Sequence, residues 1–483
     1  MLTTEEIKRF IDEDKGSRLK KQAAEGQKYY EGKHDILEYR MFYYDDDGNL
    51  KEDQFRSNRK IPHPFFTELV DQATQHIMSG SDDMFKSDNP ELQKQLDLYF
   101  NTNEDFMAEL AETITGQQAK GFDYMYAYIG EDDRLKFENA DCLGVVEVEG
   151  RFTESGKDHR IWKYVDRIDK DKKIQFKILV IDDQCTQYFK QTDDGAVELD
   201  KSVKINPKPH RFYKKEGSEE LYVKENNFLP FFMLPYNKKR TSHLKPIKPL
   251  IDDYDLMSSS LTNNLVDFDH PLHVVKGFEG DDLGKLTMNL NTAKRIGVGE
   301  GGDVDIKTVA IPYDARKVKM ELDEKNIYRF GMGLNMSGLK DTAATTNIAI
   351  KAAYSLLELR CSKIKTELKR FLRQILKVVL EEINEKEGTD YQPSMVYFNF
   401  EAEIMANETE NAQNKLVEAQ EQQTRINTLL TLATQLDNET LMQLICEVLD
   451  IDYEEIKSKL PDPDEADNNI DDALGALGGG VIE

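Results

Sequence analysis

The chain has few cysteines and no pattern that would group them. Its 483 residues contain four, Cys142, Cys185, Cys361 and Cys446, and no two of them form a CxxC pair. Structural zinc sites and disulfide frameworks both need paired or regularly spaced cysteines. The spacing therefore argues against both and indicates a reduced, cytosolic protein.

Long apolar runs are also missing. No segment approaches the ~18 apolar residues of a membrane span, so no membrane partner is expected. The N-terminus, Met1–Lys8, resembles a capped helix start and lacks the apolar core of a signal peptide. With a mean hydropathy of −0.64 and 32% charged residues, the chain is expected to be soluble and globular, with about two to four domains.

The third absence is net positive charge. The formal net charge is −27, whereas proteins that grip nucleic acid usually present a basic face that displaces counterions from phosphate. Two compatible interpretations remain. The acidity keeps a large assembly soluble, or any DNA that the protein meets passes without adhering.

Periodicity predicts a mixed α+β fold that is mainly helical. Residues 1–120 are predicted to be helical, with one helix at Pro64–Met78 stopped by Gly80 and another that begins at Asn103. Between 122 and 235 the pattern changes to short alternating runs separated by Asp, Gly and Lys, which is typical of antiparallel hairpins.

The second half contains the longest helical pattern. A helical stripe from Leu250 to Phe268 is followed by a glycine-rich stretch, 270–311, and by a helix from Pro312 to Phe330. The loop Gly331–Gly338 then leads into a segment free of glycine and proline up to Glu387. A helix of ~40 residues would span about 60 Å. Its apolar stripe comprises Ala353, Leu357, Ile364, Leu368, Phe371, Ile375, Val379 and Ile383.

Three motifs suggest chemistry, and none meets its requirements. Gly297–Gly302 matches G-x-G-x-x-G, but a strand-like run follows it where a helix is needed. Gly333–Gly338 has P-loop spacing, yet Leu339-Lys340-Asp341 replaces Lys-Ser/Thr. Asp267, His270 and His273 resemble a metal site, but a proline breaks their helical register. We expect no catalytic residue, no metal and no cofactor.

The loop Gly331–Gly338 has two interpretations on composition alone. Its three glycines join two helices while Met332 and Met336 fill a core, or it is a mobile loop carried by a long rigid helix. The order of the neighbouring elements favours the second interpretation.

That order, namely helix, glycine-rich insertion, helix, loop and long helix, resembles the core of the portal proteins of tailed bacteriophages, the head–tail connectors. The similarity is closest to the portals of long-tailed phages of Gram-positive bacteria and spans nearly the whole chain. No single motif is diagnostic. What is diagnostic is the order of the stretches that resemble this family. These are Tyr29–Leu37, Asn58–Gln72, Phe228–Asn237, Leu250–Ser258 and Asp437–Leu441.

The resemblance implies a portal-type ring of about twelve subunits around an axial channel, in which the apolar stripe of the long helix would be buried against neighbouring subunits. The implied regions are a wing at 1–240 (β-rich over 122–235), stem helices at 241–269 and 312–331, a clip at 270–311, a tunnel loop at 332–346, a long helix and strand at 347–399, a helical crown at 400–460 and an acidic disordered tail at 461–483.

The implied function is a non-enzymatic channel for packaging and ejection of double-stranded DNA without sequence specificity. The implied partners are the terminase, which meets the clip, head–tail adaptors, and capsid and scaffolding proteins. The protein would act at the capsid vertex of the virion and occur in the host cytoplasm during assembly. The alternatives are a virion structural or adaptor protein without a channel, and a nucleotide-binding enzyme that uses Gly297–Gly302. The candidate site residues are Asn335, Met336, Ser337, Lys340 and Asp341 in the tunnel loop, and Lys285, Asn291, Lys294 and Arg295 in the clip.

Overall fold

The computed structural model describes residues 2–267 apart from short gaps, the longest being 169–173, 215–220 and 224–228. It also describes 272–276, 303–307, 312–335 and 347–400, and short helical pieces between 420 and 444. The chain divides into two compact units, one of Met1–Asp341 with Ala352–Ile404 and one of Thr342–Lys351 with Met405–Glu483. All side chains discussed below belong to the first unit. Among the described residues, no helix is long and apolar enough to cross a membrane.

The N-terminal helices begin where the sequence offers side-chain caps. Thr3 and Glu6 form a reciprocal capping box at the start of α1 (Thr4–Lys15), and Asn103 caps α5 (Glu104–Lys120), as predicted. The helix predicted at Pro64–Met78 is α3 (Phe65–Met78), and its apolar residues Phe66, Leu69, Ala73 and Ile77 are buried. The remaining helices of this region are α2 (Arg18–Tyr30), η1 (Asp35–Glu38), α4 (Pro90–Leu96), η3 (Asp97–Asn101) and η4 (Gly150–Phe152).

Antiparallel sheets occupy the region where alternating runs predicted them. One sheet follows the order β10-β9-β8-β7-β6, with β11 also paired to β9, and a second has the order β14-β4-β5. The neighbouring strands pair antiparallel throughout. Their bounds are β4 (Phe122–Ile129), β5 (Leu135–Ala140), β6 (Val145–Val148), β7 (His159–Ile168), β8 (Ile174–Ile181), β9 (Cys185–Thr192), β10 (Glu198–Leu199), β11 (Lys208–Pro209) and β14 (Phe231–Pro235). A further pair is β12 (Phe212–Lys214) with β13 (Leu221–Val223).

Strand β8 shows why the larger sheet is covered on both faces. Leu179 and Ile181 join a core shared with β4 and Phe231, whereas the alternate residues Ile178 and Val180 join a core shared with Ile7 of α1. Successive side chains of a strand point to opposite faces. The alternation of β8 therefore places α1 on one face of the sheet and the β4 layer on the other.

The largest core surrounds α9 (Asn347–Glu387), the long helix predicted from the sequence. The stripe residues from Leu357 to Ile383 are at most 2% exposed within the single chain, where they pack with residues of α3, α5, β4 and β5. The expectation that this stripe is buried against neighbouring subunits is therefore wrong, because its own chain already covers it. After α9, η6 (Pro393–Met395) leads to β17 (Tyr397–Phe398), which pairs with β3 (Phe85–Lys86).

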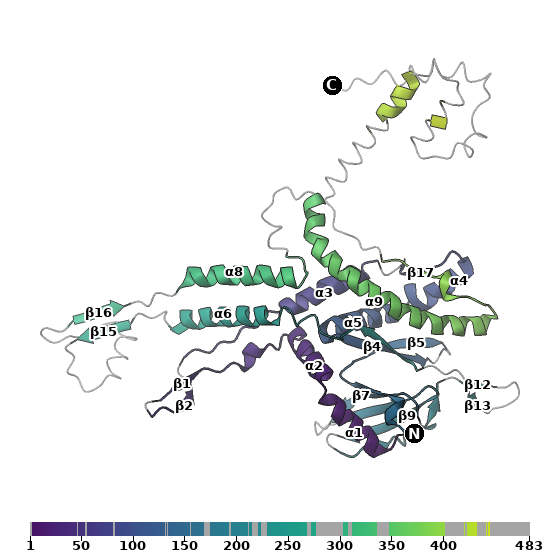
Figure 1. Cartoon of the computed structure of the whole chain (residues 1–483), viewed down its shortest axis with the longest axis horizontal. Helices are drawn as coiled ribbons and strands as arrows, with labels where there is room; N and C mark the ends of the chain where they lie inside the picture. The colour runs from purple at the N-terminus through teal and green to yellow at the C-terminus, as the bar shows by residue number, and fades with distance from the viewer. Residues whose placement is uncertain are drawn as a thin grey trace. The chain divides into compact units, whose positions relative to one another are not determined.

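The two helices predicted before and after the glycine-rich stretch are both present. They are α6 (Lys248–Asp267) and α8 (Tyr313–Phe330), and they run side by side (Figure 1). Lys319 of α8 ties them together by ion pairs to Asp253 of α6 and to Asp323 of its own helix. Beyond them, β15 (Leu272–Lys276) pairs antiparallel with β16 (Asp303–Lys307). The glycine motif Gly297–Gly302 and His270 lie outside the described residues.

A hairpin interrupts the region that was predicted to be helical. Strands β1 (Phe42–Tyr44) and β2 (Leu50–Glu52) pair antiparallel, and every residue of both strands is exposed. Asp45 closes the turn by accepting hydrogen bonds from the amides of Asp47 and Asn49, and Gly48 adopts a φ of 80°. We call residues 37–53 the hairpin arm.

Candidate functional site

The loop after α8 begins with a helix-ending motif that fixes its backbone. The Gly333 amide donates to the carbonyl oxygen of Tyr328 (3.0 Å) and the Met332 amide to that of Arg329 (3.3 Å). This pair of bonds is the Schellman arrangement. Its left-handed position is occupied by Met332, with a φ of 51°, although glycine is the usual residue there. We call residues 331–335 the loop base.

The two glycines that flank Met332 serve close packing. A Cβ added to Gly333 would lie 2.1 Å from Leu69 Cδ2, and one added to Gly331 would lie 2.6 Å from Leu69 Cδ1. Leu69 is fully buried on α3. These glycines therefore let the loop base lie directly on α3, and their interpretation as sources of flexibility is wrong for residues 331–335.

Gln72, one turn further along α3, holds the next residue of the loop base. Its Oε1 accepts from the Leu334 amide and its Nε2 donates to the Leu334 carbonyl oxygen, both at 2.9 Å. Tyr328 adds a hydrogen bond from its hydroxyl to Glu68 Oε2 at 2.6 Å. The end of α8 and the loop base are thus bonded to α3 at successive positions.

Arg360 of α9 joins four segments at this point. Its Nη1 donates to the carbonyl oxygens of Leu69 (2.8 Å) and Gly331 (3.4 Å), and its Nη2 donates to Gln118 Oε1 of α5 (2.5 Å). The side chain is only 1% exposed, and these three acceptors are neutral. The Gly331 carbonyl lies at the C-terminal end of α8, where the helix dipole favours a cation.

His243 completes the arrangement. Its Nε2 lies 2.9 Å from the Gly331 carbonyl oxygen and its Nδ1 lies 2.8 Å from the Tyr236 hydroxyl. A carbonyl can only accept, so Nε2 carries the proton and Nδ1 accepts from the tyrosine. Complete burial, together with the nearby Arg360 cation, holds the pKa of His243 well below its ordinary value. The imidazole is therefore neutral and acts as a fixed donor to the loop base.

Of the predicted tunnel-loop residues, the structure describes Asn335, which is half-buried and donates from Nδ2 to Glu324 Oε1 of α8 at 3.5 Å. The others lie outside the described residues, as do all predicted clip residues. Those positions are Met336, Ser337, Lys340 and Asp341 in the loop, and Lys285, Asn291, Lys294 and Arg295 in the clip.

A second polar cluster lies near the start of β4. Ligand-type atoms of Asp123, Asp141 and Cys142 lie within 4.8 Å of one another. Lys120 Nζ lies 2.8 Å from the Asp123 carboxylate and 2.9 Å from that of Asp141, and burial raises the pKa of the Cys142 thiol. The Lys120 ammonium thus already lies against both carboxylates and offsets part of their charge, and the thiol is protonated. The cluster is an internal ion pair.

Comparison with known proteins gives a match over most of the chain. The model of the family described as "Phage portal protein, SPP1 Gp6-like" matches residues 10–458. The chain belongs to this portal family. The portal protein of Bacillus phage SPP1 is 26% identical over 392 residues, which cover 80% of this chain and 74% of that protein. The portal protein of Clostridium phage phiCD119 is 27% identical over 191 residues, covering 38% of this chain and 41% of that one.

Likeness to solved structures is more distant. A chain from the neck of a native GTA particle, computed with C12 symmetry, has a TM-score of 0.37 at 12% identity and covers 80% of this chain and 95% of its own. A chain from the neck of an empty GTA particle, computed with C6 symmetry, has a TM-score of 0.33 at 13% identity. This match covers 63% of the present chain and 76% of the GTA chain. Both lie below the level at which a shared fold follows. The resemblance to phage portals that the sequence indicated is confirmed by the family match.

Sequence reasoning missed the residues that hold the loop base of this portal-family chain. Arg360 lies three residues after Leu357 and four residues before Ile364. At this spacing the apolar stripe predicts another apolar residue. A lone cation on the buried face of a long helix was the available signal. Gln72 and His243 carried no comparable signal, because their partners are backbone groups far away in the sequence.

Proposed function

We propose that this chain is the subunit of a portal ring that conducts viral DNA during packaging and ejection. The observation that carries the proposal is the portal-family match over residues 10–458. The ring would contain about twelve copies related by rotation, as closed head-to-tail assemblies are. It would occupy the capsid vertex in the virion and assemble in the host cytoplasm.

Within that ring, α6 and α8 form the stem, residues 1–240 the wing and 400–460 the crown. The segment 332–346 is the tunnel loop, and 347–399 contains the long helix and the strand after it. The loop base supports this assignment, because it bonds the start of the loop to α3, α5 and α9 through Gln72 and Arg360. Displacement of the loop by passing DNA would then begin beyond Asn335.

The clip would be the stretch 270–311, which follows α6 and precedes α8. Lys285, Asn291, Lys294 and Arg295 supply donors and cations there that suit contacts with the terminase and later with head–tail adaptors. The ATP hydrolysis that drives packaging belongs to the terminase motor. Capsid and scaffolding proteins would contact the outer regions of the ring.

The decisive test is the assembly state of the purified protein. We expect annular particles with a central channel in negative-stain micrographs, and a mass several-fold above 55.7 kDa by mass photometry. A monomer without annular particles under assembly conditions would overturn the proposal. A compact oligomer without a channel would favour an adaptor or other structural role.

A second test addresses DNA contact in the loop. Lys340 is the only cation in the sequence between Arg329 and Lys351, and it stands beside Asp341, so its contact with phosphate would be transient. Lys340→Ala is expected to reduce the amount of DNA packaged in an in vitro packaging reaction while rings still form. Normal packaging would show that this residue does not contact the DNA.

A further inference from the structure

The hairpin arm is fixed at its base but carries exposed apolar side chains at its tip. Phe42 is 54%, Leu50 58% and Tyr44 73% exposed. Because Tyr44 pairs with Leu50 in the antiparallel register, and Phe42 lies two residues from Tyr44, the three lie on one face. A two-stranded hairpin alone is marginally stable in water. Among the residues that the structure describes, the strands of the arm therefore lack the packing that such hairpins require.

The base of the arm is held by a polar ladder along α6. Side chains of every fourth α6 residue accept from the amides of every second residue in 57–63. The bonds join Asp255 to His63 (2.9 Å), Ser259 to Ile61 (3.0 Å), Asn263 to Arg59 (2.7 Å) and Asp267 to Ser57 (3.1 Å). Four helical residues rise about 6 Å and two extended residues about 6.6 Å, so the two repeats match.

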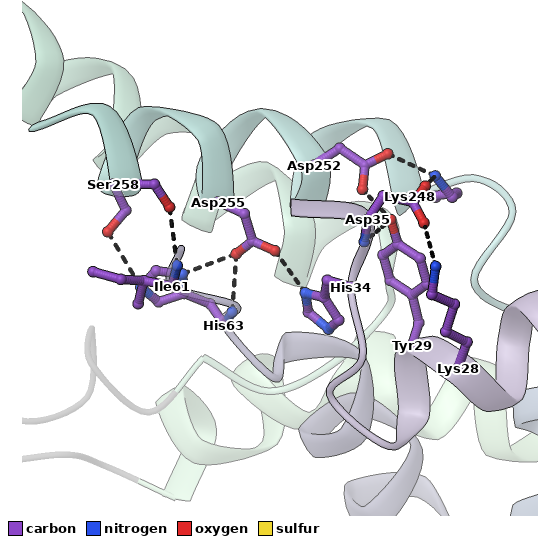
Figure 2. A network of polar contacts seen from close by, with 11 residues as sticks. Lys28, Tyr29, His34, Asp35, Ile61, His63, Lys248, Asp252, Asp255 and Ser258 are labelled. Atoms are coloured by element: carbon purple, nitrogen blue, oxygen red, sulfur yellow. Dashed lines mark hydrogen bonds and ion pairs between the residues drawn. The ribbon is translucent and has the colours of Figure 1, made fainter. Parts of the chain in front are cut away.

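The ladder is strongest at Asp255, which is 1% exposed. Its carboxylate contacts His63 through one oxygen and the fully buried His34 through the other, at 2.9 and 2.6 Å (Figure 2). Lys60, in the segment after the arm, donates a hydrogen bond from Nζ to the carbonyl oxygen of Leu37, the first residue of the arm, at 2.8 Å. The segment before the arm and the segment after it are thus both tied, and the direction of the arm is set by α6.

A complementary surface lies on α8. Val318, Leu322, Lys325 and Arg329 follow the spacing i, i+4, i+7 and i+11, which places them on one helical stripe. All four are exposed, Val318 by 64% and Leu322 by 52%. We call these residues the α8 stripe. Lys319, which bonds to α6, lies on a different side of the helix, so the stripe faces away from α6.

The charges of the two surfaces are opposite. The hairpin arm, residues 37–53, contains two cations and six carboxylates, a formal charge of −4, whereas α8 contains five cations and four carboxylates, a formal charge of +1. On the α8 stripe itself the two charged positions, Lys325 and Arg329, are both cations. Acidic residues around an apolar tip match basic residues around an apolar stripe.

We propose that the hairpin arm of each subunit packs on the α8 stripe of a neighbouring copy of this chain. The proposal rests on the ring proposed above, and it names one contact by which that ring closes. The arm extends from one face of α6 and the stripe faces away from α6, so a subunit presents the two surfaces on different sides of its helix pair. Head-to-tail contacts that close a ring require such a pair of unlike surfaces.

Cross-linking between two variants that each carry one added cysteine tests the contact. Tyr44→Cys and Leu322→Cys chains carrying tags of different size are co-assembled and treated with a short bismaleimide. A product that contains both tags can form only between subunits, and we expect it in the ring fraction. Tyr44→Cys mixed with Lys94→Cys, at an exposed α4 position, is the matched control, and wild type mixed with each variant measures reaction of the native cysteines.

Rings without the mixed product, or with equal yield in the Lys94→Cys control, would overturn the proposal. Absence of wild-type rings would overturn the proposed function instead, so the two failures are distinguishable. Amide hydrogen exchange of the wild-type protein gives a second readout that needs no variant. Residues 42–52 should exchange at least tenfold more slowly in the ring than in the dissociated chain, and equal rates would contradict the contact.

Discussion

The loop base and the hairpin arm are both short connections beside long helices, but their side chains have opposite environments. In the loop base, the carbonyl of Gly331 accepts from Arg360 of α9 and from His243, and the amide and carbonyl of Leu334 bond to Gln72 of α3. In the arm, every strand residue is exposed. The loop base is thus supported from within its own chain, whereas the arm exposes both of its strands, so a partner for its packing has to be sought outside the described residues.

The largest effect is expected at Arg360. Arg360→Met removes three hydrogen bonds and leaves buried acceptors on Leu69 and Gln118 without this donor, so the free energy of unfolding should fall by about 2–6 kcal/mol, at about 1–3 kcal/mol for each acceptor. Urea denaturation followed by circular dichroism measures it. Arg373→Met, at an exposed position of the same helix, is the control. Equal stability of the two variants would show that the guanidinium does not hold the loop base.

A second large effect is expected in the core behind the loop base. Leu368→Ala on α9 empties a fully buried site and should cost about 2–5 kcal/mol. Leu359→Ala, on the same helix but 51% exposed, should change thermal stability little. If both variants melt at the wild-type temperature, the stripe of α9 is not core.

The close approach of Gly333 to Leu69 should be visible as energetic coupling. Gly333→Ala forces its Cβ against the Leu69 side chain and should cost about 1–3 kcal/mol. In the double variant with Leu69→Ala the clash is absent, so the combined cost should be smaller than the sum of the single costs. Additive costs in this cycle would mean that the loop base does not rest on Leu69. Gly16→Ala, whose new Cβ would make only ordinary contacts, is the control.

The neutral state of His243 predicts a pH dependence. Because the folded pKa is depressed, the unfolded chain binds more protons below its own value of about 6.5, and folding loses stability as the pH falls through that value. The slope contributed by one such group is at most about 1.4 kcal/mol per pH unit. His243→Gln should flatten the dependence between pH 7 and 5. The comparison with wild type is needed because the pKa values of His76 and His210 are lowered too.

Parallel slopes for His243→Gln and wild type would contradict this assignment. The outcome also bears on the comparison of the two regions, since His243 is one of the groups that fix the loop base from within the chain.

Local patterns predicted the elements well but not their partners. Helical spacing identified α3, α5, α6 and α9 because an apolar stripe repeats every three to four residues, and Pro312 marked the start of α8. The same spacing does not say what covers the stripe, and the stripe of α9 is covered by its own chain. The β1–β2 hairpin was missed although three aspartates and Gly48 directly follow the aromatic run Phe42–Tyr44, which is a turn signal.

The loop base was located by its glycines, but the reason for them was not predictable. Arg360 and its acceptor on Leu69 are 291 residues apart, and Gly333 meets a side chain on α3. Contacts over such separations leave no periodic trace. The left-handed residue is Met332, and the usual preference for glycine at such positions would not identify it.

The smallest effect on folding is expected in the arm. Tyr44→Ser removes a side chain that is 73% exposed, so the free energy of unfolding of the dissociated chain should change by less than about 0.5 kcal/mol. Chemical denaturation below the assembly concentration measures this. In the same variant the fraction of protein in rings should fall, because an apolar contact between copies is lost. A loss of stability above about 1 kcal/mol in the dissociated chain would show that the arm packs within its own chain, and the contrast with the loop base would then disappear.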